Sequence, residues 1–157
     1  MAEPNTTEVT LILRRIYDAP VARLWRAWTT AAELGLWYMA GEDHVIHFAE
    51  VDLRVGGGYR IGFGPPGKTP YVETGTYVEI TPMTRLAFDA GVTLGEGGAL
   101  ALALERMVVE LTDLGDGRTE LVLTDTGREA WKSGEGWLPC LESLARHLAV
   151  QRTGAPA

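Results

Sequence analysis

The sequence contains three histidines, and imidazole nitrogen is a common ligand of zinc and other transition metals. His44 and His47 lie three residues apart in a segment that reads as a strand, so their side chains point to opposite faces and cannot share an ion. His147 lies far away on the last predicted helix, and no cysteine or carboxylate joins any histidine at a ligand-like spacing. We therefore predict no metal site and no cofactor, and we expect each histidine to be solvated or at a sheet edge.

Carboxylates are the second group that could do chemistry, because two acids in different environments can serve as general acid and general base. Alternation with apolar neighbours places the candidate acids on solvent-facing positions, and nothing in their spacing brings them together. These acids are Asp43, Glu50, Asp52, Glu73 and Glu79. The single cysteine, Cys140, is expected to be a small buried residue of the last helix rather than a nucleophile. The sequence thus predicts no catalytic residue.

A glycine run and several arginines complete the inventory of candidate groups. Gly56–Gly58 joins two predicted strands, whereas phosphate-binding loops lead from a strand into a helix, so we predict a hairpin turn there. Asp52 and Arg54 share a face at i, i+2 and are expected to form a surface ion pair worth about 0–1 kcal/mol. Arg60 and Arg106 are expected to point outward, by alternation with their apolar neighbours.

The periodicity of apolar residues predicts which elements position these groups. A period near two indicates strands, and apolar spacings of three and four indicate helices. Asp18 is expected to cap the first helix, with Pro20 in its first turn, and the glycine-rich stretch 91–98 reads as a mobile loop. In chain order we predict a strand at 8–16, helices at 20–30 and 31–38, strands at 45–53, 59–63, 71–80, 85–89, 105–112 and 119–126, and a long helix from about 137 to 151.

This order predicts an α+β fold with a curved antiparallel sheet of about seven strands, wrapped around the long C-terminal helix, with two short helices after the first strand. Strands joined by short turns form an antiparallel meander with one apolar face, and only the last helix is large enough to cover that face. We predict one domain over residues 1–157, with its core at 8–150 and flexible ends at 1–7 and 152–157. The space between helix and sheet is the natural place for a pocket.

The charge balance excludes several classes of partner. The formal net charge is −7 and the 14 basic residues are scattered, so nucleic acid and anionic membrane surfaces are not expected partners. No apolar run reaches the roughly 20 residues that span a bilayer, and the polar start of the chain does not read as a signal peptide. The sequence therefore predicts a cytoplasmic protein without membrane insertion.

Four short motifs occur in a fixed order, at residues 15–29, 52–57, 75–80 and 136–141. Together they resemble the START-like (SRPBCC) superfamily, and more narrowly its bacterial branch similar to the C-terminal domain of the activator of Hsp90 ATPase. The resemblance implies the helix-grip fold, in members that bind lipids, sterols or polyketides and in some that catalyse cyclisation. The sequence departs from the pattern at Trp37-Tyr38, where the family has a Trp-Trp-like pair, and in the glycine-rich loop 91–98.

Three functions follow as hypotheses. The first is a binding domain that holds a hydrophobic, lipid- or polyketide-like molecule between the C-terminal helix and the sheet. The second is a cyclase or aromatase, which inward-pointing Tyr38, His44 or Asp125 would favour. The third is a co-chaperone-like stress-response protein with a chaperone ATPase as partner, and the sequence does not decide between monomer and homodimer. The predicted cavity-lining residues are Trp37, Tyr38, Tyr59, Ile61, Phe63, Val78, Met107, Val109, Leu121, Leu123, Trp137, Leu138, Leu141 and Leu144.

Overall fold

The protein is described here from a computed structural model, which covers residues 8–38, 44–128, 130 and 135–152. Two short helices follow the first strand, six strands come next, and a long helix closes the described part of the chain. In chain order the elements are β1 (Val9–Tyr17), α1 (Val21–Thr29), α2 (Ala31–Trp37), β2 (Val45–Val51), β3 (Gly58–Gly64), β4 (Tyr71–Thr81), β5 (Arg85–Leu94), β6 (Leu100–Asp113), β7 (Thr119–Gly127) and α4 (Trp137–Arg152).

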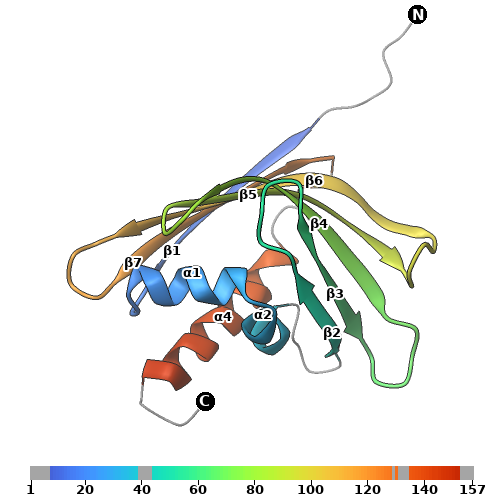
Figure 1. Ribbon diagram of the computed structural model, residues 1–157, viewed down its shortest axis with the longest axis horizontal. Coiled ribbons are helices and arrows are strands. Elements are labelled where there is room, and N and C mark those ends of the chain that lie inside the picture. The colour runs from blue at the N-terminus through green and yellow to red at the C-terminus, as the bar shows by residue number, and fades with distance from the viewer. Residues whose placement is uncertain (1–7, 39–43, 129, 131–134, 153–157) are drawn as a thin grey trace, which may run out of the picture.

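All seven strands form one antiparallel sheet in the order β1-β7-β6-β5-β4-β3-β2. Consecutive strands from β2 to β7 are neighbours, and β1 adds to the free side of β7. The sheet curves over the three helices, which all lie on its concave side (Figure 1). The predicted α+β helix-grip architecture is therefore confirmed. Among the described residues, no helix is both long enough and apolar enough to cross a bilayer.

Local sequence explains where the last hairpin turns. Gly115 and Gly117 adopt φ angles of 88° and 82°, which glycine reaches without the steric penalty of a Cβ atom. The Asp113 side chain accepts a hydrogen bond from the Gly115 N–H at 2.8 Å, as is typical of Asp in tight turns. This turn sets the register of β6 against β7, in which Val109 faces Leu123 and Met107 faces Asp125.

Helix α1 begins differently from the prediction. Pro20 is its N-cap residue, in an extended conformation, and no side chain caps the helix, so the predicted role of Asp18 is wrong. The helices are joined instead by an ionic cluster around Glu33 of α2, which accepts hydrogen bonds from Arg23 at 2.5 Å and Arg26 at 2.6 Å. His147 of α4 lies 2.8 Å from the same carboxylate and is mostly buried. The prediction of a solvated or edge histidine is therefore wrong for His147, whereas His44 and His47 are exposed.

The first half of the glycine-rich stretch 91–98 is strand rather than loop, which corrects the prediction there, whereas residues 95–98 form a turn. β5 continues through Gly91 to Leu94, and β6 starts at Leu100, five residues before the predicted strand. The register explains this result, because Gly91 pairs with Thr74 on one side and Val92 pairs with Leu102 on the other. A Cβ atom on Gly91 would lie only 3.0 Å from the Leu102 carbonyl oxygen, so the glycine permits close packing inside the sheet.

The concave side of the sheet has two parts. We use "packed half" for the part around Leu86, Val109, Leu121 and Leu123, which α1 and the middle of α4 cover with apolar side chains and which is almost completely inaccessible. We use "polar half" for the part around Glu73, Glu105 and Asp125, next to the start of α4. The predicted flexible ends lie outside the described residues, except for Arg152, the last residue of α4.

Candidate functional site

Three carboxyl groups lie inside the protein on the polar half. Glu73 of β4 is 2% exposed, Glu105 of β6 is 3% exposed and Asp125 of β7 is fully buried. Each alternates with outward-facing residues, and so shares its face with the inward-facing Tyr77, Met107 or Leu123 of the same strand. We call these three residues the carboxyl cluster. Their burial is unusual, because Asp and Glu side chains are mostly exposed in folded proteins.

The strand register gathers the cluster around a floor of small residues. Tyr59 faces Gly75, Gly75 faces Ala90 and Ala90 faces Glu105, so these four residues form one row across β3, β4, β5 and β6. Glu73 lies one inward position from Gly75 along β4. Because Gly75 and Ala90 have small side chains, larger groups on the concave side can approach the backbone of the sheet between the acids.

Two tyrosines hold Glu73 in place. Tyr38 is the residue directly after α2, and its hydroxyl donates to Glu73 Oε2 at 2.8 Å. The Tyr59 hydroxyl donates to the same oxygen. The Tyr59 ring reaches this position by lying across β4 at Gly75, where a Cβ atom would come within 2.0 Å of the ring. Gly75 is thus needed for close approach of a side chain, and Tyr38 brings a polar tip where the family has a second tryptophan-like residue.

Asp125 is held from the helix side. The Trp137 indole N–H, at the first residue of α4, donates to Asp125 Oδ2 at 2.8 Å. Its other oxygen, Oδ1, is buried and accepts no hydrogen bond from the described residues. The Trp137 ring also packs near Tyr38, with centroids 6.1 Å apart, so that α4 and α2 approach the cluster together.

Burial shifts the acidity of these groups. It raises the pKa of Glu73 to about 7, although the Tyr59 and Tyr38 hydrogen bonds oppose the rise. It also raises the pKa of Asp125 to about 7, against the Trp137 hydrogen bond and with the help of a hydrogen-bonding contact with the Glu105 carboxyl and of the Glu105 and Glu73 charges. For the same reason the pKa values of Tyr38 and Tyr59 lie well above 10. Near neutral pH, Glu73 and Asp125 can therefore either hold or release a proton, which is the property of general acids and bases.

The aromatic side chains next to the cluster are closely packed. They leave a cavity of about 10 Å³, which is room for about one water molecule. The Trp28 indole N–H and the Tyr77 hydroxyl are buried and have no hydrogen-bond partner among the described residues. The residues that line this cavity are Trp28, Leu34, Tyr38, Tyr59, Tyr77, Leu86 and Phe88.

Most of the predicted cavity-lining residues lie inside the protein, but two do not. Val78 is 37% exposed, because its neighbour Tyr77 takes the inward position on β4. Leu138 is 42% exposed, because Trp137 and Leu141 define the buried face of α4. Their predicted positions are wrong. The buried members are Trp37, Tyr38, Tyr59, Ile61, Phe63, Met107, Val109, Leu121, Leu123, Trp137, Leu141 and Leu144, and their contact with a ligand stays a prediction.

The predicted solvent-facing position is wrong for Glu73 and right for Glu50 and Glu79. Glu73 follows Val72, which is also buried, so the apolar alternation that marks an inward face is broken at this point of β4. Glu73, Gly75 and Tyr77 stand at every second position of the strand, and this spacing predicts that Glu73 shares a face with Tyr77. Asp43 lies outside the described residues. Cys140 is buried, as predicted. Among the described residues, no three His, Cys, Asp or Glu side chains are arranged so that they could hold one metal ion.

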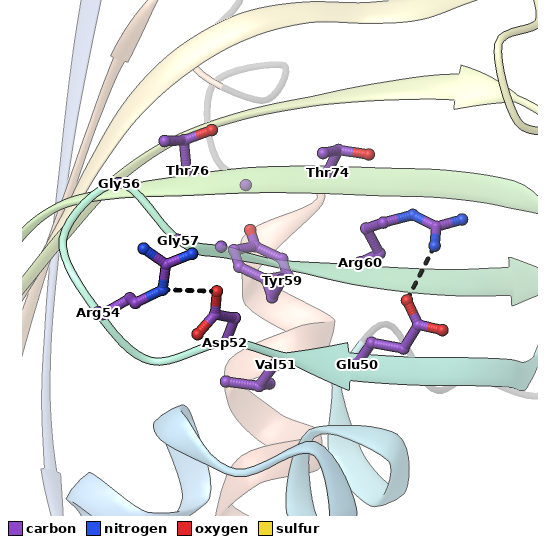
Figure 2. Close-up of a pocket in the computed structure, with 12 residues that line it drawn as sticks. Glu50, Val51, Asp52, Arg54, Gly56, Gly57, Tyr59, Arg60, Thr74 and Thr76 are labelled. Atoms are coloured by element: carbon purple, nitrogen blue, oxygen red, sulfur yellow. Dashed lines mark hydrogen bonds and ion pairs between the residues drawn. The ribbon is translucent and has the colours of Figure 1, made fainter.

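A shallow groove on the molecular surface, next to the turn between β2 and β3, has a volume of about 410 Å³. Figure 2 shows its charged residues arranged as two neighbouring pairs, Arg54 with Asp52 at 2.9 Å and Arg60 with Glu50 at 2.8 Å. The predicted surface pair and the outward position of Arg60 are confirmed, as is that of Arg106, which pairs with Asp89. Since these charges already neutralise each other, the groove offers less distinctive chemistry than the carboxyl cluster.

Solved structures show the same fold. A protein from Rhizobium leguminosarum is 21% identical, with a TM-score of 0.77 over 92% of this chain and 97% of its own. Mll3558 from Rhizobium loti is 26% identical, with a TM-score of 0.71 over 92% of this chain and 99% of its own. DynU16, from the dynemicin biosynthetic locus, is 20% identical, with a TM-score of 0.67 over 90% of this chain and 48% of its own.

The family is established by a match along most of the chain. No curated protein matches the sequence. A family model matches residues 18–149, which run from the end of β1 into the last turn of α4 and include all three members of the carboxyl cluster. The chain therefore belongs to the family of Activator of Hsp90 ATPase homolog 1-like proteins.

Proposed function

We propose that this protein binds a hydrophobic small molecule on the polar half of its concave face, with the polar end of the ligand at Glu73 and Asp125. The observation that carries the proposal is the carboxyl cluster itself. Buried acids on three strands destabilise a fold unless they have partners, and residues of perturbed pKa gather at functional sites. A face that served only for packing would be more stable with apolar residues at these positions.

The surroundings of the cluster support a ligand with an apolar body. Ile61 and Phe63 of β3 flank Glu73, while Trp137 and Leu141 of α4 lie opposite the sheet. Phe63 and Val92 each keep 8% of their surface accessible, whereas Leu121 and Leu123 of the packed half keep none. This difference favours the polar half as the part of the concave face that a ligand reaches. Few polar groups among many apolar ones are typical of small-molecule sites.

Room for the ligand must come from side-chain movement, since the described aromatic cavity holds about one water molecule. The Tyr59 ring is the side chain best placed to give this room, because it lies over Gly75 at the edge of the aromatic cavity and its hydroxyl contacts Glu73. A ligand group that takes over the hydrogen bond to Glu73 would free the ring to turn. We therefore expect binding to change the environment of Tyr59.

A second candidate, a cyclase- or aromatase-type enzyme, is favoured by one specific observation. Tyr38 and Asp125 both lie on the interior side of the sheet, while His44 is exposed. A phenol and two carboxyls with pKa values of about 7 form a set that can donate and accept protons on a bound substrate. The enzyme hypothesis would be the better one if the protein converted a bound polyketide-like compound, and if Asp125→Asn abolished this turnover but still bound the compound.

The binding proposal is tested by a thermal-shift and native mass-spectrometry screen of lipophilic compounds against the wild type and Glu73→Gln. We expect compounds that raise the melting temperature of the wild type and remain bound in the mass spectrum, with a clearly smaller shift in Glu73→Gln. Asp89→Asn, which alters a carboxylate on the outer face, serves as the matched control and should behave as the wild type. A screen without any hit would contradict the proposal. Binding to a chaperone ATPase stays a prediction, because no contact of the described residues bears on it.

A further inference from the structure

We infer that the ligand of the polar half carries a cationic nitrogen, as an amine or quaternary ammonium group on an apolar body. The inference rests on the proposed function and specifies the class of ligand. Its basis is the proximity of two kinds of group, buried carboxyls without a described counter-ion and electron-rich aromatic rings that contact them. Both kinds attract organic cations, and together they resemble no site for an anion.

The first observation concerns the missing counter-ions. Within the described ranges, the ion pairs of arginine lie on the outer face of the sheet, in surface turns or among the helices. None of them involves Glu73 or Asp125. Buried carboxylates are normally paired, because an isolated charge in a medium of low polarity is strongly unfavourable. A bound cation would supply the partner that these two acids lack in the described structure.

The second observation concerns a free acceptor. Asp125 Oδ1 is completely buried and accepts no hydrogen bond from the described residues, although Oδ2 of the same carboxyl accepts one from Trp137. Both phenols that contact Glu73 donate to its Oε2 oxygen, and no described residue donates to its Oε1 oxygen. Of these oxygens, Asp125 Oδ1 is a buried acceptor that no described N–H or hydroxyl group reaches, and the Glu105 carboxyl lies in contact with the same side chain. An ammonium group has up to three N–H donors and a positive charge.

The third observation concerns the rings around these acids. Tyr38 lies 6.1 Å from Trp137 and 6.3 Å from Tyr59, and Trp28 lies 6.2 Å from Trp137, measured between ring centroids. Among the described residues, Arg60 makes a cation–π contact with Phe48, on the other face of the sheet from Tyr59. Trp and Tyr faces within about 6 Å of a cation attract it, by roughly 2 kcal/mol or more when it is desolvated.

The protonation state of the acids separates this ligand class from a neutral one. Glu73 faces Tyr38, Tyr59 and the charge of Glu105, while Asp125 faces Trp137, Glu105 and Glu73. A carbonyl or hydroxyl ligand that accepts hydrogen bonds needs the protonated acids, so its affinity falls as the pH rises through about 7. A cation needs the ionised acids, so its affinity rises over the same range.

The experiment compares three probes of equal chain length, octylamine, octan-1-ol and octanoate, by isothermal titration and tryptophan fluorescence at pH 5.5 and 8.5. We expect octylamine to bind at least tenfold more tightly than octan-1-ol at pH 8.5, with octanoate weakest, and this preference to shrink at pH 5.5. Because the pH comparison uses the wild type alone, it does not depend on the folding of any variant. Equal affinity for octylamine and octan-1-ol at pH 8.5 would overturn the inference.

Variants locate the binding site of the amine. Glu73→Gln and Asp125→Asn should each weaken octylamine at least tenfold and leave octan-1-ol within about twofold, while the control Asp89→Asn leaves both unchanged. Unchanged octylamine affinity in both cluster variants would place the amine elsewhere and contradict the inference. The experiment distinguishes failure of the binding proposal from failure of the inferred ligand class. If none of the three probes binds, both are contradicted. If the probes bind without preference for the amine, only the inferred ligand class is contradicted.

Discussion

The packed half and the polar half of the concave face are made by the same strands, and their chemistry changes within two residues. On β7, Leu123 of the packed half is followed at the next inward position by Asp125. On β6, Val109 and Met107 are separated from Glu105 by the same alternation. All of these residues are equally buried. Burial therefore does not separate these particular residues, and the type of side chain at each position distinguishes the two halves.

The physical consequences of burial are opposite in the two halves. In the packed half, removal of apolar surface from water stabilises the fold by about 25 cal/mol for each Å². In the polar half, removal of Glu73 and Asp125 from water opposes folding, and hydrogen bonds from Tyr59 and Trp137 offset part of that penalty. The packed half should thus determine how stable the protein is, and the polar half how that stability responds to pH and ligand.

The largest effect is expected from Leu123→Ala in the packed half. Leu123 is completely buried and pairs with Val109, so its truncation leaves a cavity that the sheet cannot close. We expect the free energy of unfolding to fall by about 2–5 kcal/mol. Urea denaturation followed by circular dichroism measures it. The loss should be the same at pH 5 and pH 8, and a loss that depends on pH would mean that the two halves are not independent.

The second prediction concerns the pH dependence of stability. The pKa of Glu73 is about 7 in the folded protein against 4.5 for the free group, and that of Asp125 is about 7 against 3.8. Because both values are raised, the folded state binds more protons than the unfolded state at intermediate pH. Their contribution to stability is full below about pH 4 and is lost as the pH rises to about 7.

We therefore expect the wild type to lose a few kcal/mol of stability between pH 5 and pH 8, since one pKa unit corresponds to about 1.4 kcal/mol. Glu73→Gln and Asp125→Asn should each flatten this dependence, and at pH 8 each variant should be as stable as the wild type or more stable. Glu33, whose pKa is held below its usual value by His147, Arg26 and Arg23 against the effect of burial, titrates below this window. A wild type that gains stability between pH 5 and pH 8 would contradict the assignment.

Gly75→Ala is expected to have an intermediate effect, confined to the polar half. The added methyl group would lie within 2.0 Å of the Tyr59 ring, which must then leave β4 and lose its hydrogen bond to Glu73. We expect a loss of about 1–3 kcal/mol, typical of an overpacked interior. In a Tyr59→Leu background the same substitution should have a much smaller effect, and a double-mutant cycle measures the difference. Equal losses in both backgrounds would show that the ring is not the obstacle.

The order of elements could be predicted from the sequence because periodicity is a local signal. The long helix α4, the β6–β7 hairpin and the two short helices follow from apolar spacing and turn residues. The error at β5 has a physical reason, since strand formation at Gly91 depends on the neighbouring Thr74 and on close packing with β6. A local reading of the glycines indicates a loop, which is right for residues 95–98, whereas at Gly91 the neighbouring strands keep the segment extended.

The carboxyl cluster could not be predicted in the same way. Glu73, Glu105 and Asp125 lie on β4, β6 and β7, and their convergence depends on strand order and register. From the sequence, Tyr38, His44 and Asp125 are the residues expected to matter if they pointed inward, and of these only Asp125 belongs to the cluster. Hydrophobicity patterns assign an acid to the surface by default, so a buried acid is the kind of residue for which such patterns fail. Functional sites are where local rules are most often broken.

The smallest effect is expected on the outer surface, which serves as the reference for both halves. Asp52 and Arg54 form an ion pair whose side chains are mostly exposed, and such pairs contribute about 0–1 kcal/mol. Asp52→Ala should therefore change stability by no more than about 1 kcal/mol, and by less in 0.5 M salt. The variant has a second readout, because burial and the charge of Asp52 together raise the pKa of Tyr77 to about 12. Spectrophotometric titration should show this tyrosine ionising at lower pH in Asp52→Ala. An unchanged titration would mean that the surface charge does not reach the interior, and that the acids of the polar half respond only to one another.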